Sequence, residues 1–207
     1  SMEPCRIKAV LFDFGGVLAD EGFRKGLVHI AQVNGLDPDE FFEVTRELIY
    51  STGYINGLCG EAFFWDQLRM STGIRGTDEG FREIILERFL IRDWMMDLVR
   101  RLKDKSLRVA ILSDQTNWLD ELDQRLSFSG LFEQVFNSYH LGKSKADPSL
   151  FAEVLSLMGL KPGEALFVDD TRGNIERARA AGLATILFSG SQQFLCELER
   201  FCPGVVP

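Results

Sequence analysis

Short, mainly apolar runs that alternate with helical patterns constrain the fold of this chain more than any other feature. Four or five such runs occur, at residues 7–12, 108–112, 135–137, 165–168 and 185–188. None alternates polar with apolar side chains, which predicts strands that are covered on both faces of a sheet. The strand–helix alternation therefore predicts an α/β fold with a parallel sheet, right-handed crossovers and flanking helices.

The segment from residue 19 to residue 92 differs from the rest of the chain because it contains no convincing strand. Apolar side chains recur there at helical spacing in three stretches, which glycine-bearing breaks separate. A connection of this length is far longer than an ordinary crossover between parallel strands. We therefore predict a helical cap subdomain at residues 19–92, inserted into a core formed by residues 1–18 and 93–207.

Charge and composition narrow the classes of partner. The net charge of −8 argues against a nucleic-acid partner, which requires a basic face, and gives little attraction to an anionic membrane. No apolar run approaches the ~20 residues of a membrane helix, and the first residues lack a signal-peptide pattern. Four cysteines without a Cys-x-x-Cys pair, and only two histidines, argue against a zinc site. We expect a cytoplasmic protein with reduced thiols.

Polar side chains follow three of the predicted strands, at the edge where parallel sheets bind ligands. They are Asp13, Ser113, Asp114, Asp169 and Asp170, and Lys145 precedes a later helix. Each of these residues taken alone is more often a helix cap or a solvated loop residue than a functional one. Together, three carboxylates at neighbouring strand ends repel one another unless a cation lies among them. Oxygen donors without histidine or cysteine favour Mg²⁺ over zinc.

In these motifs the sequence resembles the haloacid dehalogenase superfamily, which comprises hydrolases with an aspartate nucleophile, a Rossmann-like core and an inserted helical cap. Residues 10–18 resemble the first motif of that family, and residues 111–114 resemble the second. The third resembles residues 145–148, which begin with Lys145, and the fourth resembles residues 167–174. Each motif alone is weak, but all four occur in order and at strand ends.

The resemblance implies a role for each motif residue. Asp13 would attack phosphorus and form an aspartyl-phosphate that water then releases. Asp13, Asp169 and the backbone carbonyl of Gly15 would hold Mg²⁺ between the nucleophile and the phosphate. Ser113 would donate a hydrogen bond to a phosphate oxygen. Lys145 would neutralise the phosphate and orient Asp13.

Three further residues have supporting roles in this interpretation. Asp114, next to the serine of the second motif, is expected to contact the substrate. Asp170 would bind the waters of the metal or Lys145 rather than the metal itself. Asn174 stands where the family often has another acid, so we place it outside the metal's direct ligands as well. Lys143 is expected to be solvated.

The first motif departs from the family's pattern at Gly15. Many phosphatases of the family carry a second aspartate there, which protonates the leaving alcohol and then activates water. Such a group contributes a factor of ~10²–10⁴ to the rate. The substrate could be an anomeric or acyl phosphate, whose leaving group needs little protonation. Alternatively, water or a cap residue such as Asp20, Glu21 or His29 could substitute, or catalysis could be lost and a phosphate-binding or interaction module remain.

The interpretation that accounts for most residues is a Mg²⁺-dependent phosphatase of a small phosphorylated metabolite, such as a sugar phosphate, acting as a monomer or homodimer. A metal-independent 2-haloacid dehalogenase is the alternative, because expulsion of halide needs no proton and so agrees with Gly15. That reading leaves Asp169 and Asp170 unexplained. Four cap side chains are candidates for the pocket wall, although packing or surface roles are more common for such residues. They are Arg24, Tyr54, Trp65 and Arg69.

Overall fold

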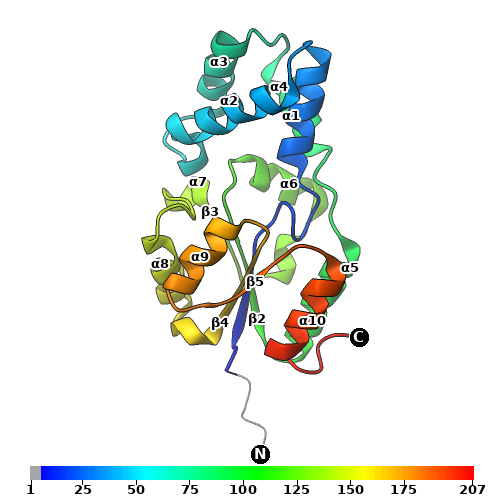
Figure 1. Ribbon diagram of the computed structural model, residues 1–207, viewed down its shortest axis with the longest axis vertical. Coiled ribbons are helices and arrows are strands. Elements are labelled where there is room, and N and C mark those ends of the chain that lie inside the picture. The colour runs from blue at the N-terminus through cyan, green and yellow to red at the C-terminus, as the bar shows by residue number, and fades with distance from the viewer. Residues whose placement is uncertain (1–5) are drawn as a thin grey trace, which may run out of the picture.

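A parallel five-stranded sheet forms the centre of the lower part of the molecule (Figure 1), as the computed structural model shows for the described residues 6–207. Its strands are β1 (Ala9–Phe12), β2 (Arg108–Ser113), β3 (Gln134–Asn137), β4 (Ala165–Asp169) and β5 (Ala184–Leu187). Their spatial order is β3-β2-β1-β4-β5, and every neighbouring pair is parallel. The α/β fold class predicted from the sequence is confirmed.

Helices cover both faces of this sheet. Residues Val10 and Phe12 of β1 pack on one face, and Ala9 and Leu11 pack on the other. The first face is covered by α5 (Asp93–Asp104), α6 (Trp118–Leu126) and α10 (Ser191–Phe201). The second face is covered by α8 (Ser149–Met158) and α9 (Arg172–Ala180). Burial on both faces explains why the strands read as continuous apolar runs.

The order in which the chain adds parallel strands to the sheet switches sides between β1 and β4. From β1 it proceeds to β2 and β3 on one side, and then returns to β4 and β5 on the other. Ligands bind at such a switch point, outside the carboxyl ends of the strands. Asp13 directly follows β1, and its backbone N–H donates to the carbonyl of Val168 in β4 at 2.9 Å. Asp169 is the last residue of β4, so the topology brings these two acids together.

Four helices between β1 and α5 lie beyond the carboxyl ends of the strands, in the upper part of Figure 1. They are α1 (Gly22–Val33), α2 (Pro38–Ser51), α3 (Glu61–Thr72) and α4 (Asp78–Leu86), with a 3₁₀ turn η1 (Tyr54–Asn56) after α2. We call this group the cap helices. The division of the chain into separate domains at residues 18 and 93 stays a prediction.

Short elements complete the core. They are η2 (Ser129–Leu131), α7 (Ser138–Leu141) and η3 (Pro162–Glu164). Side chains at the starts of several cap helices satisfy backbone N–H groups that no helical carbonyl can reach. Glu21 accepts from the N–H of Phe23 at 3.0 Å at the start of α1. None of the helices in residues 6–207 combines the length and apolar character needed to cross a membrane.

Hydrogen bonds join the cap helices to the core. The pairs are Tyr50–Asp114, Tyr54–Asn117, Glu61–Trp118, Glu83–Arg125 and the carbonyl of Ile55 with Ser138. Trp118 also packs on the aromatic side chains of Tyr54 and Trp65. These contacts hold the cap helices over the end of the sheet where the acids lie.

Candidate active site

A buried lysine joins the two acids at the switch point. The Nζ atom of Lys145 donates to Oδ1 of Asp13 at 3.0 Å and to Oδ2 of Asp169 at 2.7 Å. Lys145 is 2% exposed and Asp169 is fully buried. Buried charges are stable only when they are paired and hydrogen-bonded, so this network requires all three side chains. The site brings together Asp13, Asp169 and Lys145, as the sequence motifs predict.

One oxygen of Asp13 carries the hydrogen bonds that orient the carboxylate. Oδ1 accepts from the Ser113 hydroxyl at 3.0 Å and from the backbone N–H of Phe14 at 2.9 Å, in addition to Lys145. Within residues 6–207, no hydrogen bond reaches Oδ2. Asp13 is 8% exposed and lines a cavity. The carboxylate is therefore held rigidly, with one oxygen available for a reaction or a cation.

Asp170 joins the two buried acids in one cluster. Asp13, Asp169 and Asp170 each offer a carboxylate oxygen, and these three oxygens lie within 4.8 Å of one another. One lysine balances only one of the three negative charges. Oxygen donors at this spacing, without a histidine or cysteine among them, fit a hard divalent cation such as Mg²⁺. The donor set therefore fits the metal that the sequence analysis expects.

The hydrogen bonds distinguish the two adjacent acids of β4 and its following loop. Asp169 accepts from the N–H of Thr171 at 2.8 Å on Oδ1, and from Lys145 and Asn174 on Oδ2. Asp170 is exposed, and its hydrogen bond with the Thr171 hydroxyl is long, at 3.5 Å. The family resemblance implies that Asp169 binds the metal and that Asp170 lies outside its direct ligands. This geometry favours Asp170 as the more available ligand.

Asn174 supports the acids through its amide group. Its Nδ2 donates to Asp169 at 3.1 Å, and its Oδ1 accepts from Arg177 at 2.6 Å. Arg177 also donates to the backbone carbonyl of Lys145 at 2.7 Å. These contacts agree with the prediction that Asn174 lies outside the metal's direct ligands. Sequence reasoning did not single out Arg177, although its spacing of three residues puts it on the same side of α9 as Asn174.

Asp114 links the loop of Lys145 to a cap helix. Its Oδ1 accepts from the backbone N–H of Lys145 at 2.9 Å, and its Oδ2 accepts from the hydroxyl of Tyr50 at 3.3 Å. Asp114 also lines the cavity, so contact with a substrate remains open to it. Lys143 lies elsewhere, with Nζ 2.7 Å from Glu153 on α8. This placement agrees with the choice of Lys145 over Lys143.

The charges of the cluster depend strongly on burial. Burial raises the pKa of the Asp13 carboxyl well above its usual range, Asp169 adds to the rise, and Lys145 opposes it. For Lys145, burial acts to lower the pKa, but the attraction of Asp13 and Asp169 outweighs burial and raises it well above the usual value. Lys145 is therefore a permanent cation. A divalent ion beside Asp13 would favour the ionised form of its carboxyl group. A carboxyl group must be ionised to act as a nucleophile.

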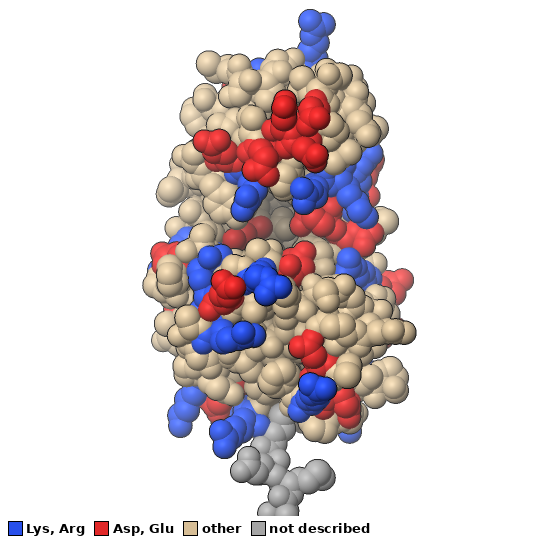
Figure 2. Space-filling model, in the orientation of Figure 1, with Lys and Arg blue, Asp and Glu red and all other residues tan. Residues whose placement is uncertain are grey.

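A cavity of about 490 Å³ separates the cluster from the cap helices. Figure 2 shows the recess between the two parts of the molecule, with acidic and basic side chains at its rim. The core contributes Asp13, Ser113, Asp114, Gln115, Thr116, Lys145, Asp170 and Asn174, and the cap helices contribute Arg24, Phe42, Arg46, Ile49 and Tyr50. Its volume lies in the range that holds a small metabolite.

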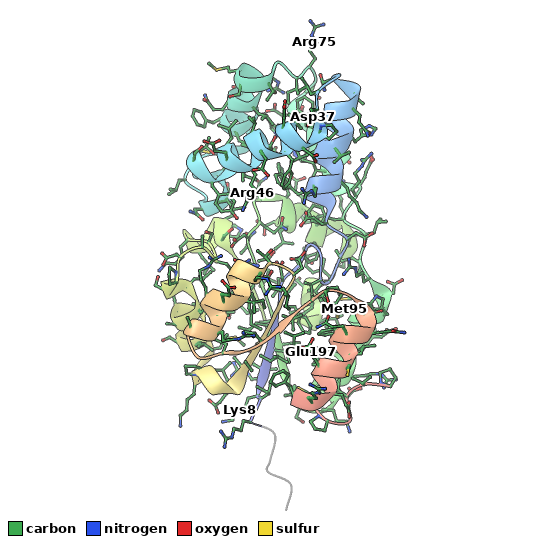
Figure 3. All side chains as sticks on the ribbon, in the orientation of Figure 1. Lys8, Asp37, Arg46, Arg75, Met95 and Glu197 are labelled. Atoms are coloured by element: carbon green, nitrogen blue, oxygen red, sulfur yellow. The ribbon has the colours of Figure 1, made fainter. Side chains whose placement is uncertain are left out.

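The cap side of the cavity is basic and aromatic. Figure 3 places Arg46 on the underside of α2, between the cap helices and the sheet. Arg24 lies over the ring of Phe42 at 4.2 Å. In the part of the chain that the structure describes, neither arginine has a carboxylate within salt-bridge distance. Both guanidinium groups therefore remain available to an anionic ligand.

The other cap residues considered for the pocket wall have structural roles. Tyr54 and Trp65 are fully buried among aromatic rings. Arg69 pairs with Asp66 and Asp78. Arg24 alone of the four candidates lines the cavity. Arg46 and Tyr50 were missed because their orientation depends on how α2 rotates over the core, which sequence periodicity does not report.

Glu21 occupies the space next to the glycine of the first motif. A Cβ atom built on Gly15 would lie 2.9 Å from Oε2 of Glu21 and 3.1 Å from the ring of Phe89. Both Gly15 and Glu21 line the cavity. Asp20, another candidate for the missing acid, instead contacts Lys25 and Arg92 at 3.3 and 3.4 Å. His29 is not among the cavity-lining residues.

Glu21→Gln is expected to stabilise the metal-free protein at about pH 7 and to have little effect at about pH 4. Burial raises the pKa of Glu21 above its usual value of 4.5, so the folded chain binds this proton more tightly than the unfolded chain. The ionised carboxylate thus destabilises the fold as the pH rises above that value, and the amide removes this cost. Urea unfolding at both pH values measures the difference. A larger gain at the lower pH would contradict the assignment.

Comparison with known proteins shows similarity in sequence over most of the chain. A sequence model of the haloacid dehalogenase-like hydrolases matches residues 7–182. The first curated relatives share 24% to 32% identity, and the matched segment of this chain covers only 20% to 56% of their length. A phosphoglycolate phosphatase from Aquifex aeolicus matches more evenly, with 27% identity over 87% of this chain and 84% of the relative.

Solved structures share the fold. A family enzyme from Bacteroides thetaiotaomicron, solved with magnesium and inorganic phosphate, superimposes with a TM-score of 0.72 at 24% identity, covering 88% of this chain and 94% of that one. An L-2-haloacid dehalogenase from Xanthobacter autotrophicus superimposes with a TM-score of 0.65 at 20% identity, covering 97% and 85%. Because both metal-bound and dehalogenating enzymes share this fold, the fold alone does not select the reaction.

Proposed function

Since the chain belongs to the haloacid dehalogenase-like hydrolases, we propose that it is a Mg²⁺-dependent phosphatase of a small phosphorylated metabolite. The observation that carries this proposal is the cluster of Asp13, Asp169 and Asp170 around the buried Lys145. Three carboxylates and one ammonium leave a negative surplus that a divalent cation neutralises. With that cation bound, the cavity base becomes a receptor for an anionic phosphoryl group.

Asp13 is the nucleophile in this proposal. Its carboxylate attacks phosphorus, the phosphorus–oxygen bond to the leaving group breaks, and an aspartyl-phosphate forms. The Ser113 hydroxyl and the Lys145 ammonium lie at the same carboxylate, where they orient Asp13 and can donate to phosphate oxygens. Water then attacks phosphorus and releases inorganic phosphate, which restores the Asp13 carboxylate.

The metal would be held by Asp13, Asp170 and the backbone carbonyl of Gly15, with the carboxylate of Asp169 beside them. The exposed carboxylate of Asp170 and the triple hydrogen bonding of Asp169 support this order. When bound, Mg²⁺ would offset the repulsion between the nucleophile and the incoming phosphate. Asn174 and Arg177 keep Asp169 and the Lys145 loop in place.

The cap side of the cavity favours a substrate with a second anionic group. Arg24 and Arg46 are two cations opposite the cluster, without a protein carboxylate at salt-bridge distance within residues 6–207. A guanidinium binds a carboxylate or phosphate through paired hydrogen bonds. The A. aeolicus relative is named for phosphoglycolate, which carries both a phosphate and a carboxylate. A monomer or homodimer without nucleic-acid or membrane partners stays our expectation.

A 2-haloacid dehalogenase is the second candidate, because the dehalogenase neighbour has the same fold and halide needs no proton from residue 15. In that reaction Asp13 would attack carbon, and water would then hydrolyse the ester at the Asp13 carbonyl carbon. The arrangement of Asp170 beside the buried acids has no function in that chemistry. We therefore favour phosphoryl transfer.

Removal of metal is expected to abolish phosphate release. Chelation with EDTA should stop hydrolysis of p-nitrophenyl phosphate, and added Mg²⁺ should restore it, because the cluster cannot otherwise accept an anion. Asp170→Asn should raise the Mg²⁺ concentration for half-maximal rate by about 10- to 100-fold. Asp147→Asn is a matched control, since Asp147 is an exposed acid that contacts Ser149. Undiminished phosphate release in EDTA, or halide release from 2-chloropropionate, would overturn the proposed function.

A further inference from the structure

The space that an acid at residue 15 would use is filled by a different acid. The backbone of Gly15 is not in the left-handed region, in contrast to Gly16, whose φ is +86°. Backbone strain therefore does not explain the glycine at position 15. Crowding by neighbouring side chains explains the glycine, because a Cβ atom at residue 15 would lie only 2.9 Å from Oε2 of Glu21. A side chain at residue 15 and the observed position of Glu21 exclude each other.

We propose that Glu21 is the proton donor and acceptor of this enzyme, an inference that rests on the proposed phosphatase function. Glu21 lines the same cavity as Asp13 and reaches it from the start of α1 instead of from the first motif. Its Oε1 accepts from the N–H of Phe23 at 3.0 Å, which fixes the side chain. Its Oε2 is directed to Gly15, two residues after the nucleophile.

The other acids of the cavity are engaged elsewhere. Asp13 and Asp170 belong to the cation cluster. Asp114 accepts hydrogen bonds through both oxygens, from Tyr50 and from the backbone of Lys145. No histidine is among the cavity-lining residues. Glu21 lies outside the cluster, and within residues 6–207 its carboxylate accepts only from backbone N–H groups at the start of α1, those of Phe23 and Arg24.

The two chemical steps balance with one proton on Glu21. In the first step, Asp13 attacks phosphorus, and the bond between phosphorus and the leaving oxygen breaks. The electron pair of that bond goes to the leaving oxygen, which takes the proton from the Glu21 carboxyl. The alcohol leaves. In the second step, water attacks phosphorus and gives a proton to the Glu21 carboxylate, while the bond to Asp13 breaks and its electron pair returns to the Asp13 carboxylate. Glu21 is again protonated.

Glu21→Gln isolates this role, because the glutamine oxygen can still accept from Phe23 at the start of α1. For an alkyl phosphate, kcat/KM should fall by ~10²–10⁴-fold, since the alkoxide must be protonated. For p-nitrophenyl phosphate, whose leaving group needs little protonation, kcat/KM should fall less than about tenfold. The second step is then slow, so a burst of nitrophenol equal to the enzyme concentration should precede a slow steady state.

Asp20→Asn is the matched control, because Asp20 is the adjacent acid but pairs with Lys25 and Arg92. It should leave both substrates unaffected. Equal losses for the two substrates without a burst would show that Glu21 is only structural and would overturn the proposal. If the wild-type enzyme releases no phosphate from either substrate, the proposed function fails instead, and the two failures are thereby distinguished.

A relocation of the acid provides an independent test. Glu21→Ser keeps a side-chain oxygen at the start of α1 and vacates the space beside Gly15. The double variant Gly15→Asp with Glu21→Ser should hydrolyse alkyl phosphate at least about tenfold faster than Glu21→Ser alone. Gly15→Asp alone should displace the carboxylate end of Glu21, because its Cβ meets Oε2, and is not expected to exceed the wild-type rate. A folded double variant that is no more active than Glu21→Ser would count against the proposal.

Discussion

Asp13→Asn is expected to lower phosphate release by about 10⁴-fold or more. The amide retains the shape of the side chain and an oxygen that can accept from Ser113 and Lys145, but it is not a nucleophile. Initial rates with p-nitrophenyl phosphate and saturating Mg²⁺ measure the loss. Asp97→Asn is the control, since Asp97 is an exposed acid on α5 that pairs with Arg100 away from the cavity.

A variant that keeps more than a tenth of the wild-type rate would remove Asp13 from the covalent step. Single turnover in H₂¹⁸O separates the two candidate reactions as well. A phosphatase places ¹⁸O in the released phosphate, because water attacks phosphorus. A dehalogenase places ¹⁸O in the carboxylate of Asp13, because water attacks the ester carbonyl carbon.

Lys145→Met is expected to lower the free energy of unfolding of the metal-free protein by about 3–5 kcal/mol. The substitution leaves Asp13 and Asp169 buried without their shared cation. Urea unfolding at neutral pH in EDTA measures the loss. Lys143→Met is the matched control from the same loop, because Lys143 pairs with Glu153 away from the cavity, and we expect little change.

Addition of Mg²⁺ should recover part of the stability that Lys145→Met loses, because a divalent ion neutralises the same carboxylates. Phosphate release should stay very low even so, since the lysine also compensates the charge of the substrate. Equal stability of the Lys145→Met and Lys143→Met proteins would show that the buried network is unimportant for folding. It would also remove the electrostatic argument for the cation site.

The sheet and the position of the acids could be predicted because each depends on local sequence. The apolar run before Asp13 became β1 with a shift of two residues at its start, and the run at residues 165–168 became β4 with one added residue. Burial on both faces makes such runs apolar throughout, and parallel strands align their carboxyl ends.

The cap side of the site could not be predicted in the same way. Arg46 and Tyr50 are four residues apart and share one side of α2, but the sequence does not show whether that side faces the core or solvent. Hydrogen bonds across distant segments determine the answer. The same limit applies to Glu21, whose proximity to Gly15 depends on how the chain turns between β1 and α1.

Which of Asp169 and Asp170 is the more exposed could also not be predicted from the sequence. Adjacent acids at a strand end differ only in which side chains surround them. Asn174 and Lys145 converge on Asp169 from α9 and from the loop before α8, and they leave Asp170 exposed. A motif gives the residue types, whereas the folded contacts decide which carboxylate remains available to an ion.

Beryllium trifluoride, which mimics a phosphoryl group on a carboxylate, tests the central claim most directly. A crystal structure of the protein with Mg²⁺ and this probe is predicted to show beryllium bonded to an Asp13 oxygen, with Mg²⁺ between Asp13 and Asp170. A structure at saturating Mg²⁺ and probe in which Asp13 is unmodified and the cluster holds no cation would contradict the account.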